Sequence, residues 1–141
     1  MLESVSPKRY GAEGNISYYI DVLRAIDPDV VCLQEIHFYP DGHSQADEIS
    51  RALGLSHVFQ KDVHVSHLLP GRRMGQAVIS RFPLEDRKEV LLPYPSFELK
   101  PKDGRVAARH DKYLLITKTA GVTIATTQFR VRIHRLARDD R

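Results

Sequence analysis

The stretch Asp27-Pro-Asp-Val-Val-Cys-Leu-Gln-Glu-Ile36 decides the expected fold of this chain. Its first two residues end a helix, because proline disfavours the helical conformation in the residue before it. The apolar run over residues 30–33 follows without a polar interruption. Such a run is typical of a strand buried on both faces, as in the parallel sheets of α/β proteins. Gln34 and Glu35 come directly after it, and one of them must face something other than the core.

Helical patterns stand on both sides of this strand. Apolar residues recur at helical spacing from Asn15, a suitable N-cap, to Ile26, so we predict a helix over this segment. A second helix is predicted over residues 45–53, with Ser44 as its N-cap and Gly54 at the left-handed position after its last turn.

The rest of the chain has the shorter period of strands. Strands are predicted over residues 57–61, 76–80, 88–92, 112–119 and 122–127, the last two joined as a hairpin. This order predicts an α/β protein, bordering on α+β, with a mixed sheet and flanking helices.

Composition narrows the class of protein. The chain has 141 residues and no apolar run long enough for a membrane span. Its single cysteine, Cys32, excludes an internal disulfide and is interpreted as a small core residue. We therefore expect a cytoplasmic location and no membrane span.

The net charge of +3 is unevenly distributed. Residues 130–141 hold five arginines and two aspartates, so the rest of the chain has no net charge. We divide the chain into a poorly structured segment over residues 1–14, one domain over residues 15–129 and a basic tail over residues 130–141. The tail leaves open a non-catalytic function, as a nucleic-acid-binding module.

Glu35 is the residue with the clearest chemistry. It follows a buried strand, and side chains at strand ends emerge into the crevices where α/β proteins bind ligands. A carboxylate there is costly unless it is paired or coordinates a cation, and a hard oxygen ligand suits Mg²⁺ or Mn²⁺. Local chemistry also allows, and by itself favours, a capping or salt-bridged glutamate.

Three segments resemble, in order, motifs of the endonuclease/exonuclease/phosphatase superfamily. The opening stretch is similar to the signature PDVVCLQE, and residues 74–83 are similar to GNAILSRFP, with Gln76 in place of asparagine. Residues 121–129 resemble the strand that ends in NTHL. The resemblance implies a partial four-layer α/β sandwich of the deoxyribonuclease-I-like type. It also implies metal-dependent hydrolysis of phosphoester or phosphodiester bonds.

The resemblance assigns candidate roles to four residues. It implies that Glu35 binds the catalytic Mg²⁺ or Mn²⁺ and that Gln128 occupies the position of a catalytic histidine. Glutamine can donate a hydrogen bond to a phosphoryl oxygen, but it cannot transfer a proton near neutral pH. Arg81 is a candidate for phosphate contact or a surface arginine, and His110 is a candidate for substrate contact. The side chains of Glu35 and Gln128 must then face one common cleft.

Several family motifs have no counterpart in this chain. We find no first strand before the first helix, and none of the later motifs with their aspartates, asparagine and general-base histidine. We therefore expect a truncated family member, weakly active or inactive on a phosphate ester or nucleic acid, or else a non-functional remnant. Exposed sheet surface in such a fragment predicts self-association.

Overall fold

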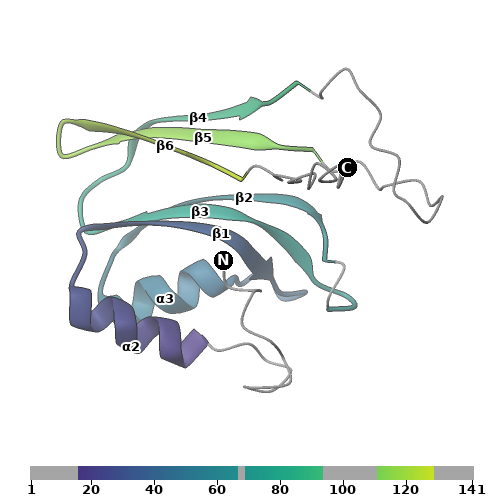
Figure 1. The fold of residues 1–141 in the computed structure, drawn as a ribbon, viewed down its shortest axis with the longest axis horizontal. Helices are drawn as coiled ribbons and strands as arrows, with labels where there is room; N and C mark the ends of the chain where they lie inside the picture. Colours follow the sequence, from purple (N-terminus) through teal and green to yellow (C-terminus); the bar gives the residue numbers. More distant parts are fainter. Residues whose placement is uncertain (1–15, 67–68, 94–110, 129–141) are drawn as a thin grey trace, which may run out of the picture.

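The computed structural model describes residues 16–66, 69–93 and 111–128. These residues form three layers, with the helices on one face of a first sheet and a second sheet on its other face (Figure 1). The elements follow in the order α2 (Ile16–Ile26), β1 (Val30–Phe38), α3 (Gln45–Leu53), β2 (His57–Val65), β3 (Arg73–Ser80), β4 (Glu85–Leu91), β5 (Tyr113–Thr119) and β6 (Val122–Thr127).

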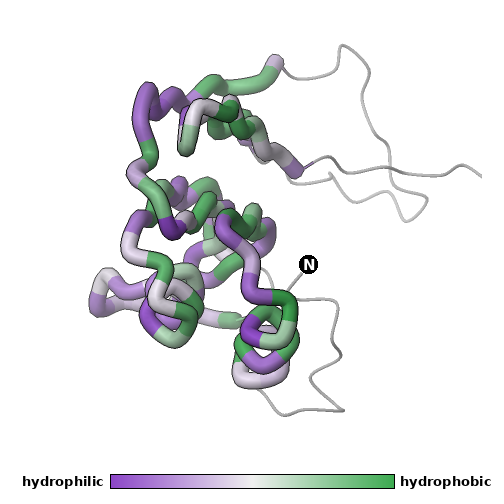
Figure 2. Tube along the Cα trace, turned by 90° about the vertical axis from the view of Figure 1, so that its left-hand side faces the viewer, coloured by the Kyte–Doolittle hydropathy of each residue, from purple (hydrophilic) through white to green (hydrophobic). Residues whose placement is uncertain are grey.

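In the described part of the chain, each sheet has three strands. Sheet A has the order β1-β3-β2, and sheet B has the order β4-β5-β6. At right angles to the first view, the two helices lie side by side below sheet A (Figure 2). Neither helix of the described part of the chain has the length and apolarity that a membrane crossing requires.

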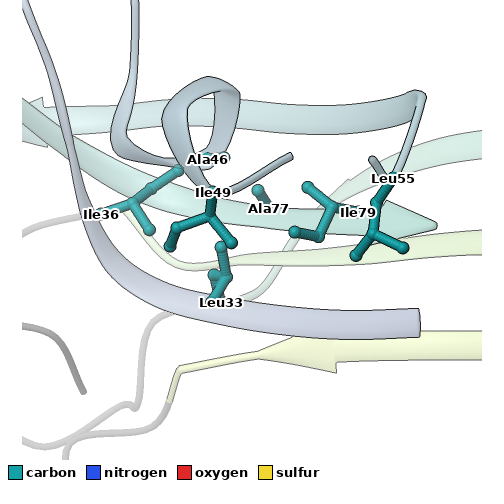
Figure 3. Close-up of a cluster of buried hydrophobic side chains, with 7 residues drawn as sticks. All are labelled: Leu33, Ile36, Ala46, Ile49, Leu55, Ala77 and Ile79. Atoms are coloured by element: carbon teal, nitrogen blue, oxygen red, sulfur yellow. The ribbon is translucent and has the colours of Figure 1, made fainter. Parts of the chain in front are cut away.

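The main core lies between α3 and sheet A. Its buried side chains come from β1, α3, β3 and the turn after α3: Leu33, Ile36, Ala46, Ile49, Leu55, Ala77 and Ile79 (Figure 3). Helix α2 adds Tyr19, Ile20 and Leu23, which are partly buried against this cluster. One face of sheet A is therefore covered by helices.

The other face of sheet A packs on sheet B. Phe59 and Val78 from sheet A meet Leu84 and Leu115 in a second apolar cluster. Polar contacts join the sheets as well, since Lys61 of β2 lies 2.6 Å from the Glu89 carboxylate of β4. The hydrogen bond to Glu89 raises the pKa of Lys61.

The predicted fold class is confirmed, and α3 has the predicted bounds. Ser44 accepts a hydrogen bond from the Asp47 amide in a capping box, and Gly54 is left-handed with φ 68°. The expectation of parallel or mixed pairing is wrong for the described residues, because β3 runs antiparallel to both of its neighbours. The apolar run in β1 arises because helices cover one face of sheet A and sheet B covers the other.

The interpretation of Cys32 as a small core residue is wrong. Its side chain is exposed, although it lies in the middle of β1. The physical reason is that β1 is an edge strand among the described residues, so only one neighbouring strand flanks it.

Apolar side chains are also exposed on sheet B, with 54% of Leu91 and 57% of Val122 accessible to solvent. The predicted self-association through such surface stays a prediction. So do the domain bounds, because residues 1–14 and 130–141 lie outside the described part of the chain.

Candidate functional site

Glu35 lies at an irregularity in β1. Gln34 pairs with Gln76 of β3 and Ile36 pairs with Gly75, so Glu35 is an extra residue between two regular pairs. Its φ of 58° lies in the left-handed region, which costs a non-glycine residue about 1–2 kcal/mol. Such an extra residue bends the strand and turns its side chain away from the normal alternation. Backbone strain of this kind concentrates at functional sites.

The strain at Glu35 gives a first prediction. We expect Glu35→Gly to have a free energy of unfolding about 1 kcal/mol higher than Glu35→Ala, because glycine adopts positive φ without a Cβ clash. Both variants lose the carboxylate, so the difference between their free energies of unfolding reports the cost of the backbone conformation at this position. Urea unfolding of the two variants checks this. An alanine variant as stable as the glycine variant would contradict a strained backbone at this position.

The irregularity is repeated on the other side of β3. The register of β2 shifts between Asp62 and His64, again opposite Gly75. A Cβ on Gly75 would lie 1.9 Å from the carbonyl oxygen of Lys61 and 3.0 Å from a ring carbon of Phe38. Glycine is therefore required where the two bulged strands close on β3.

Gln128 reaches Glu35 from the second sheet. The side-chain amide of Gln128, one residue after β6, donates a hydrogen bond to Oε1 of Glu35. Next to it, the amide of Gln34 donates to the Thr126 hydroxyl at 3.0 Å. The packing of sheet A on sheet B thus brings together two residues that are 93 positions apart. Their side chains face one cavity, as the motif resemblance requires.

The cavity is small. Its volume is about 10 Å³, which is room for about one water molecule. Besides Glu35 and Gln128, the lining residues with polar side chains are His64, Gln76, Asp111, Lys112 and Tyr113. The Nδ1 atom of His64 lies 2.9 Å from the Val65 carbonyl oxygen, which only accepts hydrogen bonds. We therefore assign the Nδ1–H tautomer to neutral His64.

Gln76 is the most deeply buried polar residue of this lining. Its side chain is 3% exposed, and its Nε2 donates to the Tyr113 carbonyl oxygen at 2.7 Å. Among the described residues, its buried Oε1 has no hydrogen-bond partner. A buried acceptor left unpaired costs about 1–3 kcal/mol.

Arg81 lies at the other end of β3 from this cavity. Its guanidinium pairs with Asp27 at 2.7 Å and with Asp29 at 3.0 Å. It does not line the cavity, so Arg81 is no part of the site proposed below. His110 lies outside the described residues, although its neighbour Asp111 lines the cavity.

The donor atoms at the cavity are oxygens of the kind that hard cations accept. Glu35 offers a carboxylate, and Gln76 offers an amide oxygen that no group of the described residues satisfies. Mg²⁺ keeps several of its waters and is usually bound through only one or two carboxylates. No cluster of three or more histidine, cysteine, aspartate or glutamate side chains able to hold a metal occurs in the described residues. The described residues therefore offer oxygen donors of the kind that a hard divalent cation accepts, in a cavity with room for about one water beside them.

Sequence reasoning had missed His64, Gln76 and Asp111 as neighbours of Glu35. His64 had no helical metal-binding spacing to other histidines, and Asp111 had only its proximity to His110 as a signal. The signal at Gln76 was its substitution for the asparagine of the motif. The roles assigned to Glu35 and Gln128 stay predictions.

Comparison with known proteins places the fold. The chain is similar to the crystal structure of an endonuclease/exonuclease/phosphatase from Beutenbergia cavernae DSM 12333, with 26% identity and a TM-score of 0.54. The match covers 80% of this chain and 32% of that one. An endonuclease/exonuclease/phosphatase family protein from Leptotrichia buccalis C-1013-b has a TM-score of 0.56 at 11% identity, which shows the fold alone. Here the match covers 96% of this chain and 54% of the other.

The sequence profile of a protein family gives the assignment. No curated protein matches the chain. The profile described as Endonuclease/Exonuclease/phosphatase family matches residues 11–139, which is most of the sequence. The chain therefore belongs to the endonuclease/exonuclease/phosphatase family.

Proposed function

We propose that this chain provides the cation-binding part of a site that hydrolyses phosphoester or phosphodiester bonds. Glu35 is the proposed ligand of Mg²⁺ or Mn²⁺. The observation that carries the proposal is the meeting of Glu35 and Gln128 in one cavity between the two sheets. Family membership supports the reaction class, and the substrate is a phosphate ester or a nucleic acid.

The residues around the cavity have separate roles in the proposed reaction. A bound divalent cation would polarise a phosphoryl oxygen and stabilise the charge of the leaving group. The carboxylate of Glu35 would hold that cation, and the bulge in β1 turns this side chain out of the strand. The ammonium of Lys112 adds positive charge to the lining, which favours an anionic ester.

The site has a glutamine at the position where the proposed reaction needs a group that can transfer a proton. The amide of Gln128 cannot accept a proton from an attacking water near neutral pH. Of the described residues that line the cavity, His64 carries an imidazole, the side chain that most often acts as a general base. Its Nδ1 is engaged by the Val65 carbonyl. We therefore propose that the chain turns over a phosphodiester slowly or not at all.

A substitution at Gln128 tests the proposed reaction. We expect Gln128→His to raise the Mg²⁺-dependent hydrolysis of bis(4-nitrophenyl) phosphate by about tenfold, because a histidine there can transfer a proton. Gln128→Asn keeps the amide and is the matched control, so its rate should stay at the wild-type level. Release of 4-nitrophenolate is the measurement.

Two further arms make this assay decisive. The gain in Gln128→His should disappear with EDTA and in the double variant that also carries Glu35→Gln. A histidine variant no faster than the asparagine variant contradicts the proposed catalytic position. A gain that survives both treatments contradicts the role of Glu35.

A further inference from the structure

The amide of Gln76 has a fixed orientation. Its Nε2 lies 2.7 Å from the carbonyl oxygen of Tyr113, and a carbonyl accepts but cannot donate. The NH₂ end of the amide must therefore point at Tyr113, and the oxygen must point away from it. The amide cannot exchange its two ends without placing two acceptors against each other.

The oxygen of Gln76 has no hydrogen-bond partner in the part of the chain that the structure describes. Within residues 16–66, 69–93 and 111–128, no group makes a hydrogen bond to the buried Oε1, and the residue as a whole is 3% exposed. When the protein folds, such an oxygen loses its hydrogen bonds to water and gains none. This loss is unfavourable unless a ligand or an ordered water forms a hydrogen bond to the oxygen. An oriented, unpaired and buried acceptor therefore points to an occupant of the cavity that the residue lines.

Gln76 and Glu35 lie at the same level of sheet A. Gln76 pairs with Gln34, and the next residue of β3, Gly75, pairs with Ile36. The extra residue, Glu35, falls between these two pairs, and both Glu35 and Gln76 line the same cavity. Two side chains with oxygen donors, one charged and one neutral, thus come from neighbouring strands to line the same cavity.

We propose that Gln76 supplies a second oxygen to the divalent cation that Glu35 holds. This inference rests on the proposed function and assigns to β3 a residue that binds the cation alongside β1. Its chemistry is suitable, since hard divalent cations accept carboxylate and side-chain amide oxygens together.

The hydrogen-bond pattern makes Gln76→Met an informative variant. Methionine has a similar length, no amide and a flexible apolar side chain that fills irregular gaps. The Tyr113 carbonyl does not lose its only partner, because the Thr127 hydroxyl also donates to it at 2.8 Å. The variant therefore removes one unpaired acceptor and leaves none behind.

The matched control is Gln34→Met. Gln34 faces Gln76 directly across the sheet, and its amide donates to Thr126 at 3.0 Å. Gln34 is not among the residues that line the cavity. Both variants replace glutamine with methionine, at two positions that pair with each other across the sheet, but only Gln76→Met removes the proposed ligand.

Mn²⁺ binding to the whole chain, followed by the EPR signal of free Mn²⁺, is the test. We expect Gln76→Met to weaken binding by about tenfold, whereas Gln34→Met binds as the wild type does. The melting temperature without metal should stay the same or rise in Gln76→Met, which separates lost ligation from lost folding. Gln76→Asn keeps an amide that is one methylene shorter, so it cannot reach the Tyr113 carbonyl and the cation together and should also bind Mn²⁺ more weakly than the wild type.

The outcomes distinguish this inference from the proposed function. If Glu35→Gln abolishes binding but both methionine variants bind like the wild type, Gln76 contacts no cation and the inference fails alone. If the wild type binds no Mn²⁺, both fail together. If Gln76→Met does not fold, Gln76→Asn decides, and an affinity equal to that of the wild type overturns the inference.

Discussion

Gly75→Ala is expected to lower the free energy of unfolding by about 3 kcal/mol or more. The added Cβ would lie 1.9 Å from the Lys61 carbonyl oxygen and 2.9 Å from its carbonyl carbon. Both contacts are with backbone, so no side chain can rotate to relieve them. Overpacking of ordinary cores costs about 1–3 kcal/mol, and a backbone collision lies at or beyond the upper end of that range.

A second glycine provides the control for Gly75. Gly121, in the hairpin between β5 and β6, has a φ of 80°, and a Cβ added to it would have no neighbouring atom within 4 Å. Gly121→Ala should therefore cost about 1–2 kcal/mol, from its backbone conformation alone. Urea unfolding of both variants is the measurement. A Gly75→Ala variant that is no less stable than Gly121→Ala would contradict the close approach of β2 to β3.

The consequence of Gly75→Ala extends to the site. Gly75 pairs with Ile36 on one side and Asp62 on the other, and both neighbouring strands are irregular at this level. Separation of β2 from β3 would shift the strand that carries Gln76 and the register that places Glu35. We therefore attribute the shape of the cavity to this glycine as much as to the residues with functional groups.

Elements with local signals could be predicted from the sequence. Helix α3 has the predicted bounds because Ser44 and Gly54 fix its two ends through contacts within a few residues. The hairpin of β5 and β6 was predicted for the same reason, since a short turn at Ala120 and Gly121 joins its strands.

Features that depend on distant partners could not be predicted. The apolar run of β1 indicates burial on both faces, but it does not distinguish parallel from antiparallel neighbours. The bulge at Glu35 depends on β3, whose residues follow about forty positions later. Strand pairing of this kind is set by tertiary packing, which the local pattern does not contain.

In the candidate site, too, some residues could be predicted from the sequence and others depend on distant partners. The motif resemblance supplied Glu35 and Gln128, although local chemistry favoured a capping role for the glutamate. The unpaired oxygen of Gln76 follows from the position of the Tyr113 carbonyl and could not be read from the sequence. Arg81 was a candidate for phosphate contact, but Asp27 and Asp29 lie within reach and pair with it.

Loss of the carboxylate at Glu35 should have the largest effect on cation binding. Removing groups that only orient a metal ligand costs about 10–100-fold in affinity, so we expect Glu35→Gln to weaken Mn²⁺ binding by more than about 100-fold. The substitution keeps the length of the side chain and an oxygen that can accept the hydrogen bond from Gln128. Folding should therefore change little while the charge that attracts the cation is lost.

Mn²⁺ binding to the wild-type chain and to Glu35→Gln, measured side by side by EPR with Mg²⁺ as competitor, tests most directly whether Glu35 holds a divalent cation. We predict that the wild type binds Mn²⁺, that Mg²⁺ displaces it, and that Glu35→Gln shows no binding at the same concentrations. Equal binding by the two chains, or no binding by the wild type, would contradict a cation site at Glu35.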